Sequence, residues 1–196
     1  MAVFTGGEVG VGFEGAGVEV QIAIFGVDLV HAQLQIAGGA SLEELGLSRE
    51  ALAPPSGFAI ETRINLEVLQ ADGSIRPSTG TLTRYEPPTG PGIRLDGAGH
   101  TGYQANPRFD SLLAKLIVHS PSSDYDLLVR RTERALSDFH VEGAATNLDL
   151  LRALLAHPDV RKNQVTTSFL ESHLPELTAD RQPAVGEPGP SRPGLA

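Results

Sequence analysis

Apolar residues between 123 and 139 recur with the period of an α-helix, and no other segment restricts the possible folds so strongly. The inward positions form one helical stripe, made of Tyr125, Leu128, Val129, Thr132, Leu136 and Phe139. Ser122 or Ser123 can cap this helix, because a serine hydroxyl accepts a hydrogen bond from an N–H group of the first turn. The segment therefore predicts an amphipathic helix that buries one face.

A second helix is predicted near the start of the chain, over residues 26–37. Its apolar stripe consists of Val27, Val30, Leu34 and Ala37. Asp28 in the first turn suits the helix dipole, and Gly38-Gly39 ends the segment. A shorter helix can follow at 41–45, where Ser41 and Glu44 have the spacing of a capping box.

Two more helices are predicted in the last third of the chain. Residues 147–157 place three leucines on one face, and Thr146 or Asn147 can cap them. Pro158 ends that helix, and a last short helix covers 166–173.

Residues 58–69 alternate with the period of a β-strand. Glu61, Arg63 and Glu67 share one face of this strand and are most simply a solvated charged face. Asp72-Gly73 can close a hairpin after it.

Four further strands complete the pattern, and one of them is ambiguous. They are predicted at 18–24, 80–86, 92–96 and 112–119. A helical start is also possible for the last. Strands followed by helices indicate an α+β domain with a mainly antiparallel sheet flanked by helices.

Composition excludes several classes of function. The chain has no cysteine, so disulfides, zinc–thiolate sites and cysteine nucleophiles are excluded. Its six histidines are scattered singly, without the spacing of metal ligands, and are more simply surface or core residues. The net charge of −9 would repel phosphate backbones, which argues against a nucleic-acid partner.

The sequence gives no sign of a membrane or export segment. No run of about 18 apolar residues is present, so we expect no membrane-spanning helix. Met1–Thr5 carries no positive charge, unlike a signal peptide. A cytoplasmic location is the simplest expectation.

Two segments could carry chemistry. Gly10–Gly15 matches GxGxxG, but the dinucleotide fingerprint needs a strand before it and a helix after it, so a flexible glycine turn is the simpler interpretation. Arg94 lies on a predicted strand, where a fixed guanidinium could hold an oxyanion by two parallel hydrogen bonds. From the residues alone, a salt bridge from Arg94 to Asp96 or Asp110 is the simpler role. Asp110 could also pair with Lys115 across a turn.

A series of short strings, in one order, resembles the biotin carboxylase family. Ala59–Asn65 is similar to its Ala-x-Glu-x-Arg-Ile-Asn strand, and Gly90–Asp96 to its Gly-Pro-Gly-Val-Arg-Val-Asp segment. Phe109–Ile117 is similar to its Tyr-Asp-Ser-Met-Ile-Ala-Lys-Leu-Ile string. The remaining matches are Gly26–Val30 with Gln33-Leu34, Pro77–Thr83, Gly102-Tyr103, Val141–Gly143 with Thr146-Asn147, and His157-Pro158. The order and spacing hold across about 26–172, with most similarity to acyl-CoA and pyruvate carboxylase-type enzymes.

The resemblance implies a fold, a reaction and partners. The fold would be that of a biotin carboxylase C-terminal domain. The family reaction uses ATP, Mg²⁺ and bicarbonate to carboxylate biotin on a carrier domain. The implied partners are a biotin carboxyl carrier domain, a second copy of the chain or a carboxylase subunit. Arg94 would stabilise the biotin enolate, where a preorganised cation meets developing negative charge. Asp110 and Lys115 would be structural supports.

Departures from the family pattern are equally informative. The family's long amino-terminal half, with its nucleotide-binding lysines, is absent from this sequence. A string with a magnesium-binding glutamate and a general base is also missing between Gly17 and Phe25. Gly12–Glu19 resembles the family strand that precedes this string, which makes Glu19 the candidate magnesium ligand. The alternative for Glu19 is an exposed strand glutamate.

These features predict three segments in the chain and allow three hypotheses about its activity. We expect a remnant of the ATP-grasp domain at 1–25, a biotin carboxylase C-terminal-like domain at 26–174, and a disordered tail or linker at 175–196. The first hypothesis is a partial biotin carboxylase that is inactive alone. The alternative is a non-catalytic module that binds a full-length carboxylase subunit or a biotin carrier domain. A third is a non-functional remnant, which would be poorly soluble.

Overall fold

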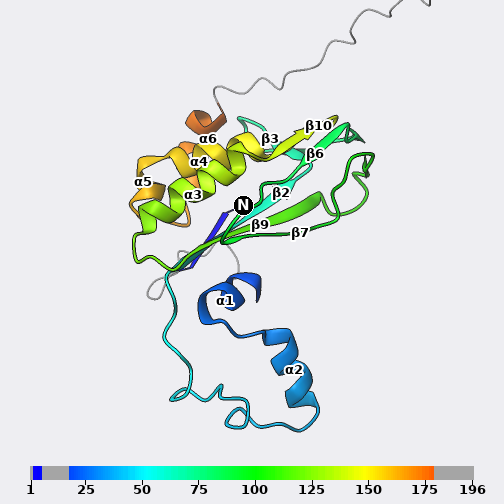
Figure 1. Ribbon diagram of the computed structural model, residues 1–196. Coiled ribbons are helices and arrows are strands. Elements are labelled where there is room, and N and C mark those ends of the chain that lie inside the picture. Colours follow the sequence, from blue (N-terminus) through cyan, green and yellow to red (C-terminus); the bar gives the residue numbers. More distant parts are fainter. Residues whose placement is uncertain (1, 6–17, 179–196) are drawn as a thin grey trace, which may run out of the picture.

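Four antiparallel strands form the central sheet, in the order β1-β2-β9-β7 (Figure 1). The computed structural model describes residues 2–5 and 18–178, with side chains described from Ile22 to Thr178. The sheet strands are β1 (Ala2–Thr5), β2 (Phe58–Asn65), β7 (Ile93–Gly97) and β9 (Leu112–Ser120). The predictions of a mainly antiparallel sheet and of strands at 58–69, 92–96 and 112–119 are confirmed in their main parts.

Short paired strands surround one end of this sheet. The pairs are β3 (Glu67–Leu69) with β4 (Ile75–Pro77), β5 (Gly80–Thr81) with β8 (Gln104–Ala105), and β6 (Arg84–Glu86) with β10 (His140–Glu142). The β3–β4 hairpin confirms the turn that Asp72-Gly73 predicts. Gly73 has φ +83°, and the Asp72 carboxylate accepts a hydrogen bond from the Ser74 N–H at 2.9 Å.

Six helices are present in the described part of the chain. They are α1 (Val18–Phe25), α2 (Leu29–Ala37), α3 (Tyr125–Ser137), α4 (Leu148–Ala156), α5 (Pro158–Arg161) and α6 (Phe169–Thr178). Figure 1 shows α3–α6 as a layer over one face of the sheet, while α1 lies on the opposite side. The expected α+β fold is confirmed.

The main core lies between the sheet and α3–α4. On β2 and β9, Ile60 stands beside Val118 and Ile64 beside Ala114, and all four are fully buried. The predicted stripe of α3 supplies the opposing surface, with Leu128, Val129, Leu136 and Phe139 buried against these strands. Each fully buried side chain of this size contributes about 1.5–3 kcal/mol of hydrophobic stabilisation. The helical period at 123–139 thus encodes the main interface of the fold.

The cap of α3 differs from the predicted one. Asp124, rather than Ser122 or Ser123, is the N-cap, and its carboxylate accepts a hydrogen bond from the Leu127 N–H at 3.0 Å. The Ser122 hydroxyl accepts from the Asp124 N–H at 3.1 Å and so supports the cap from outside. A carboxylate at this position also suits the positive end of the helix dipole.

Asn147 precedes α4 but does not cap it through its side chain. Its amide oxygen accepts from the Asn65 N–H at 2.8 Å, and its amide nitrogen donates to the Arg63 carbonyl at 3.0 Å. The side chain therefore ties the start of α4 to the bulged end of β2. Pro158 ends α4 as predicted and also begins α5.

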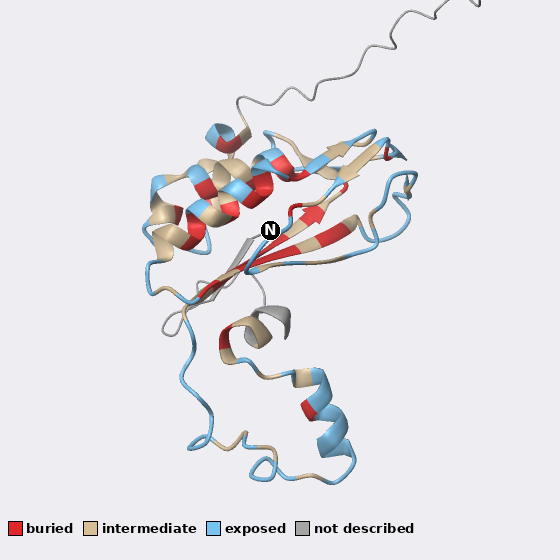
Figure 2. Ribbon diagram, viewed as in Figure 1, coloured by how far each residue is buried: buried red, intermediate tan, exposed pale blue. Residues whose placement is uncertain are grey.

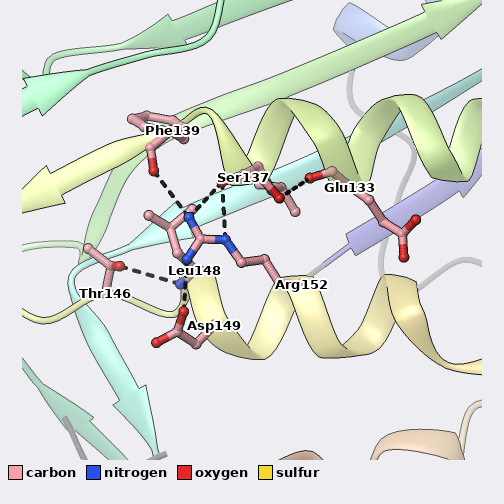
Figure 3. A network of polar contacts seen from close by, with 8 residues as sticks. Glu133, Ser137, Phe139, Thr146, Leu148, Asp149 and Arg152 are labelled. Carbon is pink, nitrogen blue, oxygen red and sulfur yellow. Dashed lines mark hydrogen bonds and ion pairs between the residues drawn. The ribbon is translucent and has the colours of Figure 1, made fainter. Parts of the chain in front are cut away.

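Arg152 joins α4 to the carboxyl end of α3 (Figure 3). Its guanidinium donates to the Leu136 carbonyl from Nε at 3.1 Å and from Nη2 at 2.7 Å, and to the Phe139 carbonyl at 3.2 Å. Asp149 holds the same group through Nη1 at 2.8 Å. The last carbonyls of a helix lack intrahelical partners, so this cation satisfies them and complements the dipole.

The strand predicted at 18–24 is wrong, because these residues form helix α1. β1 pairs with one side of β2, and β9 pairs with the other, so no edge of β2 remains for a further strand. Ile24 instead packs against Ala59 and Ile117 on the outer face of the sheet.

Helix α2 is confirmed, but its packing differs from the prediction. Asp28 is the N-cap and accepts from the His31 N–H at 2.9 Å. Val30 and Leu34, which the stripe would turn inward, are 55% and 68% exposed, and Figure 2 shows most of α2 coloured as exposed. The next segment forms turns rather than a helix, although Ser41 and Glu44 do make the predicted capping box. This apolar stripe therefore lies outside the core.

Several expectations concern residues beyond the described ranges. The GxGxxG segment Gly10–Gly15 lies outside them, as do residues 179–196. The predicted last helix, at 166–173, is α6, which starts and ends later, at Phe169 and Thr178. No helix of the described ranges is long and apolar enough to cross a bilayer.

Candidate functional site

Charged side chains gather on the face of the sheet opposite α3 and α4. The register places Arg94 of β7 beside Ile117 of β9, and Asp96 beside Lys115. Lys115 in turn lies beside Arg63 of β2. Directly opposed residues of antiparallel strands have Cα atoms about 4.5–5.5 Å apart, so these groups influence one another.

A crevice of about 220 Å³ opens between α1 and this face. The lining residues are Ile22, Ala23, Gly92, Ile93, Arg94, Ile117 and His119. An apolar lining with few polar groups is typical of sites that take a small organic molecule. Arg94 and His119 supply the polar side chains here.

Arg94 is oriented by Asp96 on the same strand. Its Nε donates to both carboxylate oxygens at 3.0 Å, and its Nη2 lies 2.8 Å from Oδ2. The salt bridge that the sequence left as the simpler alternative therefore exists, and Arg94 also lines the crevice. A guanidinium held through Nε and Nη2 is fixed in direction while its charge stays beside the cavity.

Glycine at position 92 allows β7 to reach this position. Gly92 has φ +73°, and a Cβ there would lie 2.4 Å from the His119 carbonyl oxygen. The Gly92 carbonyl accepts from the His119 N–H at 2.8 Å. A side chain at 92 would push the start of β7 away from β9, and Arg94 would move with it.

The other charged residues are held by different partners. Asp110 lies 3.7 Å from Nη2 of Arg63, a partner that the sequence did not single out. The expected pairing of Asp110 with Lys115 stays a prediction. Asp110 and Arg63 are both partly solvated, so their ion pair contributes little stability.

The interpretation of Glu61, Arg63 and Glu67 as a solvated face is wrong for Glu61, whereas Arg63 and Glu67 are half-buried. Glu61 is only 3% exposed, on the face of the sheet where Ile24 of α1 packs against Ala59 and Ile117. Glu67 accepts hydrogen bonds from Asn65 Nδ2 at 2.8 Å and from Ser111 Oγ at 2.6 Å. The two carboxylates are thus built into the sheet and its turn.

Glu19, the predicted magnesium ligand, falls within helix α1 rather than on a strand. Its side chain lies outside those that the structure describes. The alternative interpretation, an exposed glutamate on a strand, is therefore wrong about the strand. The role of Glu19 as a magnesium ligand stays a prediction.

His119 is a member of the crevice that sequence reasoning missed. Its Nε2 lies 2.9 Å from the Ser56 carbonyl oxygen, which can only accept, so Nε2 donates this hydrogen bond. The sequence did contain a signal for its position. His119 follows Lys115 and Ile117 at intervals of two along a predicted strand, so the three side chains share one face of the sheet. Ile22 and Ala23 could not be found, because they enter the crevice only as part of a helix.

Comparison with known proteins places these residues in a family. The sequence model of the biotin carboxylase C-terminal domain family matches residues 61–172 of this chain. The pyruvate carboxylase of Komagataella pastoris is 41% identical over 155 residues, which are 79% of this chain and 12% of that protein. The chain therefore spans a small part of such relatives.

Solved structures show the same likeness. A single-chain, multi-domain long-chain acyl-CoA carboxylase superposes with a TM-score of 0.79 at 42% identity, over 86% of this chain and 18% of that one. The biotin carboxylase domain dimer of Hydrogenobacter thermophilus 2-oxoglutarate carboxylase, solved with MgADP, ADP and bicarbonate, gives 0.74 at 36% identity, over 83% and 34%. Arg94, Asp96, Lys115 and His119 all lie inside the matched residues 61–172. The chain belongs to the biotin carboxylase C-terminal domain family.

Proposed function

We propose that this chain is the carboxyl-terminal lobe of a biotin carboxylase and that it frames the site where carrier-bound biotin is carboxylated. In this proposal the chain alone does not carboxylate biotin. The observation that carries this proposal is Arg94, held by Asp96 beside an apolar crevice between α1, β7 and β9.

The crevice fits the chemistry of a ureido ring. Ile22, Ile93 and Ile117 offer an apolar wall, and Arg94 offers a fixed cation. When charge develops on a ureido oxygen, a guanidinium that is already oriented stabilises it without reorganisation. Asp96 sets this orientation and keeps the arginine from turning away.

ATP and Mg²⁺ belong to the proposal as cofactors of the family reaction. When bound, ATP would supply the activation of bicarbonate. The described residues that line the crevice include no carboxylate, so magnesium binding rests on Glu19 in this proposal. The biotin carrier domain, and a second copy of the chain or a carboxylase subunit, belong to the proposal as partners.

A chimeric enzyme tests the proposed role of Arg94. Residues 61–172 of this chain would replace the matching segment of the K. pastoris pyruvate carboxylase. We expect the chimera to carboxylate biotin, and Arg94→Ala to lower its kcat by about 10²–10³, the cost of losing one transition-state charge contact. Arg134→Ala on the solvent side of α3 is the matched control and should leave the rate unchanged. Full activity in the Arg94→Ala chimera would refute the assignment.

The chain by itself requires a separate assay. ATP hydrolysis would be measured with Mg²⁺ and bicarbonate, with and without free biotin. We expect no biotin-stimulated turnover. Turnover that rises with biotin would contradict the proposal and would show that some part of 1–25 supports ATP-dependent chemistry.

One observation favours the alternative function, a non-catalytic module that binds a carboxylase subunit or carrier domain. Helix α2 exposes Val30 and Leu34, which share one helical face. Apolar side chains gathered on one helix are typical of a contact surface. Under this alternative α2, rather than the crevice, makes the functional contact.

A capture experiment separates the two functions. The tagged chain would be used to retain biotinylated protein, detected with streptavidin. If the chain is a binding module, Val30→Ser with Leu34→Ser abolishes capture and Arg94→Ala does not affect it. Absence of any biotinylated protein would count against the module.

A further inference from the structure

Two histidines and a glutamate meet at the carboxyl end of the helical layer, far along the chain from Arg94. His157 lies between α4 and α5, while His173 and Glu176 lie on α6. One donor atom from each of the three lies within 4.8 Å of the others. The sequence indicated no metal-ligand spacing among the six histidines, because this pair becomes adjacent only when α6 folds back on α4.

His173 presents a defined donor atom. Its Nδ1 lies 3.0 Å from the Phe169 carbonyl oxygen, which can only accept, so Nδ1 carries the proton. The neutral ring then has its lone pair on Nε2. A histidine whose second nitrogen donates to a carbonyl is the usual arrangement of a metal ligand, since the contact fixes both tautomer and ring direction. Phe169 also stacks on the ring, at 4.5 Å between centroids.

His157 is held beside it by ring packing. The two imidazole centroids lie 4.7 Å apart, at 70°. The His157 Nδ1 accepts from the Asp159 N–H at 3.2 Å, and the Asp159 carboxylate oxygen Oδ2 is 4.0 Å from the same nitrogen. For Nε2 of His157 to bind a metal, Nδ1 must take the proton, so its contact with the Asp159 N–H is exchanged for donation to the Asp159 carboxylate. That would be the carboxylate–histidine–metal relation that strengthens imidazole ligands.

Glu176 completes the set with one oxygen donor. It stands three residues after His173 and therefore on the same side of α6. Two imidazoles and one carboxylate form a donor set that divalent zinc accepts, with one position left for water. Nitrogen donors also select transition metals over Mg²⁺ and Ca²⁺, which prefer oxygen.

We propose that His157, His173 and Glu176 form a zinc-type divalent metal site that fastens α6 to the α4–α5 junction. Its ligands come from both sides of the α4–α6 contact, so a bound ion cross-links two elements of the helical layer. The site is separate from the crevice at Arg94, and the proposal does not rest on the function proposed there.

Zinc binding by the purified 196-residue chain tests this site. We expect one zinc ion per chain in a titration against a competing chromogenic chelator. At a free zinc concentration of about 100 times the dissociation constant, the unfolding midpoint should rise by about 5–10 °C. His173→Ala should weaken binding at least ~10-fold, because metal sites lose that much even when only a supporting residue is removed.

Two matched controls decide the assignment. Glu171→Gln alters another exposed glutamate of α6, and His31→Ala removes an exposed histidine of α2; neither should change zinc affinity. Glu176→Gln alters an exposed ligand and leaves the fold intact, so it tests the site even if His173→Ala unfolds the chain. Absence of zinc binding by the unaltered chain would overturn the proposal, and so would Glu176→Gln and His173→Ala variants that bind zinc as tightly as the unaltered chain.

Discussion

The pair formed by Arg94 and Asp96 shows how one interaction can matter for geometry rather than for stability. The guanidinium is half exposed, and exposed ion pairs contribute at most about 1 kcal/mol. The same contact fixes the direction of a planar cation beside the crevice. Removing Asp96 should therefore disturb function more than folding.

Tyr125 gives a pH-dependent prediction at the residue scale. Burial raises the pKa of its phenol above the usual value near 10, and the ring packs edge-on against Phe58 at 5.8 Å. Because the folded state holds the proton more tightly, its stabilising effect is complete below pH 10 and is lost as the pH rises above it. The free energy of unfolding should fall there, by no more than about 1.4 kcal/mol per pH unit from this group.

Urea unfolding between pH 8 and 11 would measure the effect. Tyr125→Phe keeps the ring and removes the ionisable group, so the variant should lose less stability over this range than the unaltered chain. Equal slopes in the two proteins would mean that Tyr125 ionises in the folded state as readily as in the unfolded state.

Predictability from sequence differs between Arg94 and Glu61, which both lie on predicted strands. The partner of Arg94 is two residues away on the same strand, so its salt bridge could be foreseen from local sequence. The Glu61 side chain is buried on the face where α1, more than 30 residues earlier in the chain, packs against the sheet. A strand pattern shows which face a side chain takes, but what covers that face depends on distant parts of the chain.

Substitutions of Arg152 test how strongly its hydrogen bonds join α4 to the end of α3. Its guanidinium bonds to carbonyls at the end of α3, so Arg152→Ala leaves those groups without a partner and should cost about 2–3 kcal/mol of unfolding free energy. Arg152→Lys should recover only part of this, since one ammonium cannot reproduce the planar fork. Chemical denaturation would measure both variants.

Arg134→Ala is the control for Arg152. This side chain is 87% exposed and lies 3.9 Å from Asp138, so its loss should change stability by less than about 1 kcal/mol. Equal effects of the Arg152 and Arg134 variants would show that the contacts to α3 do not stabilise the helical layer.

Two glycines with the same φ angle allow the cost of backbone strain to be distinguished from the cost of a steric clash. Gly57 and Gly46 both have φ +66°, but a Cβ at 57 would lie 2.0 Å from the Ser120 carbonyl oxygen, while nothing lies within 4 Å at 46. Gly46→Ala should cost about 1–2 kcal/mol from the left-handed backbone alone. Gly57→Ala adds a clash between β2 and the end of β9, and should cost at least about 3 kcal/mol.

Thermal or urea unfolding of the two variants gives the comparison. If Gly57→Ala were no worse than Gly46→Ala, the chain before β2 would have to move away from Ser120 at little cost.

Helix α1 shows why an element type can be misjudged while the fold class is right. Its sequence alternates valine and isoleucine with other residues, which suits a strand, but a short apolar run is equally compatible with a buried helix. The decision depends on β1, which occupies the edge of β2. The longer helix α3 was predictable, because its apolar stripe is sustained over several turns and has one interpretation.

In the whole molecule, the two faces of the central sheet are covered to different extents. The inner face of the sheet is buried by α3 and α4, whereas on the opposite side α1 packs against Ala59 and Ile117 and α2 extends beyond it (Figures 1 and 2). The sequence predicted α2 correctly as a helix. The sequence could not predict that the apolar stripe of α2 is exposed. An amphipathic pattern shows that one face of a helix is apolar, but it does not show which surface covers that face.

The exposed apolar stripe of α2 predicts that copies of the chain associate with one another. Val30 and Leu34 are 55% and 68% exposed, so contact between two chains through this helix would remove apolar surface from water. We expect the isolated chain to self-associate as its concentration rises, as measured by sedimentation equilibrium. Val30→Ser with Leu34→Ser should weaken this association by about tenfold or more, since partial burial of the two side chains contributes on the order of 1–3 kcal/mol. Gln33→Ser with Gln35→Ser alters polar positions of the same helix and should leave association unchanged. A chain that stays monomeric at all concentrations would mean that this stripe does not bind a second copy and is left for a different protein.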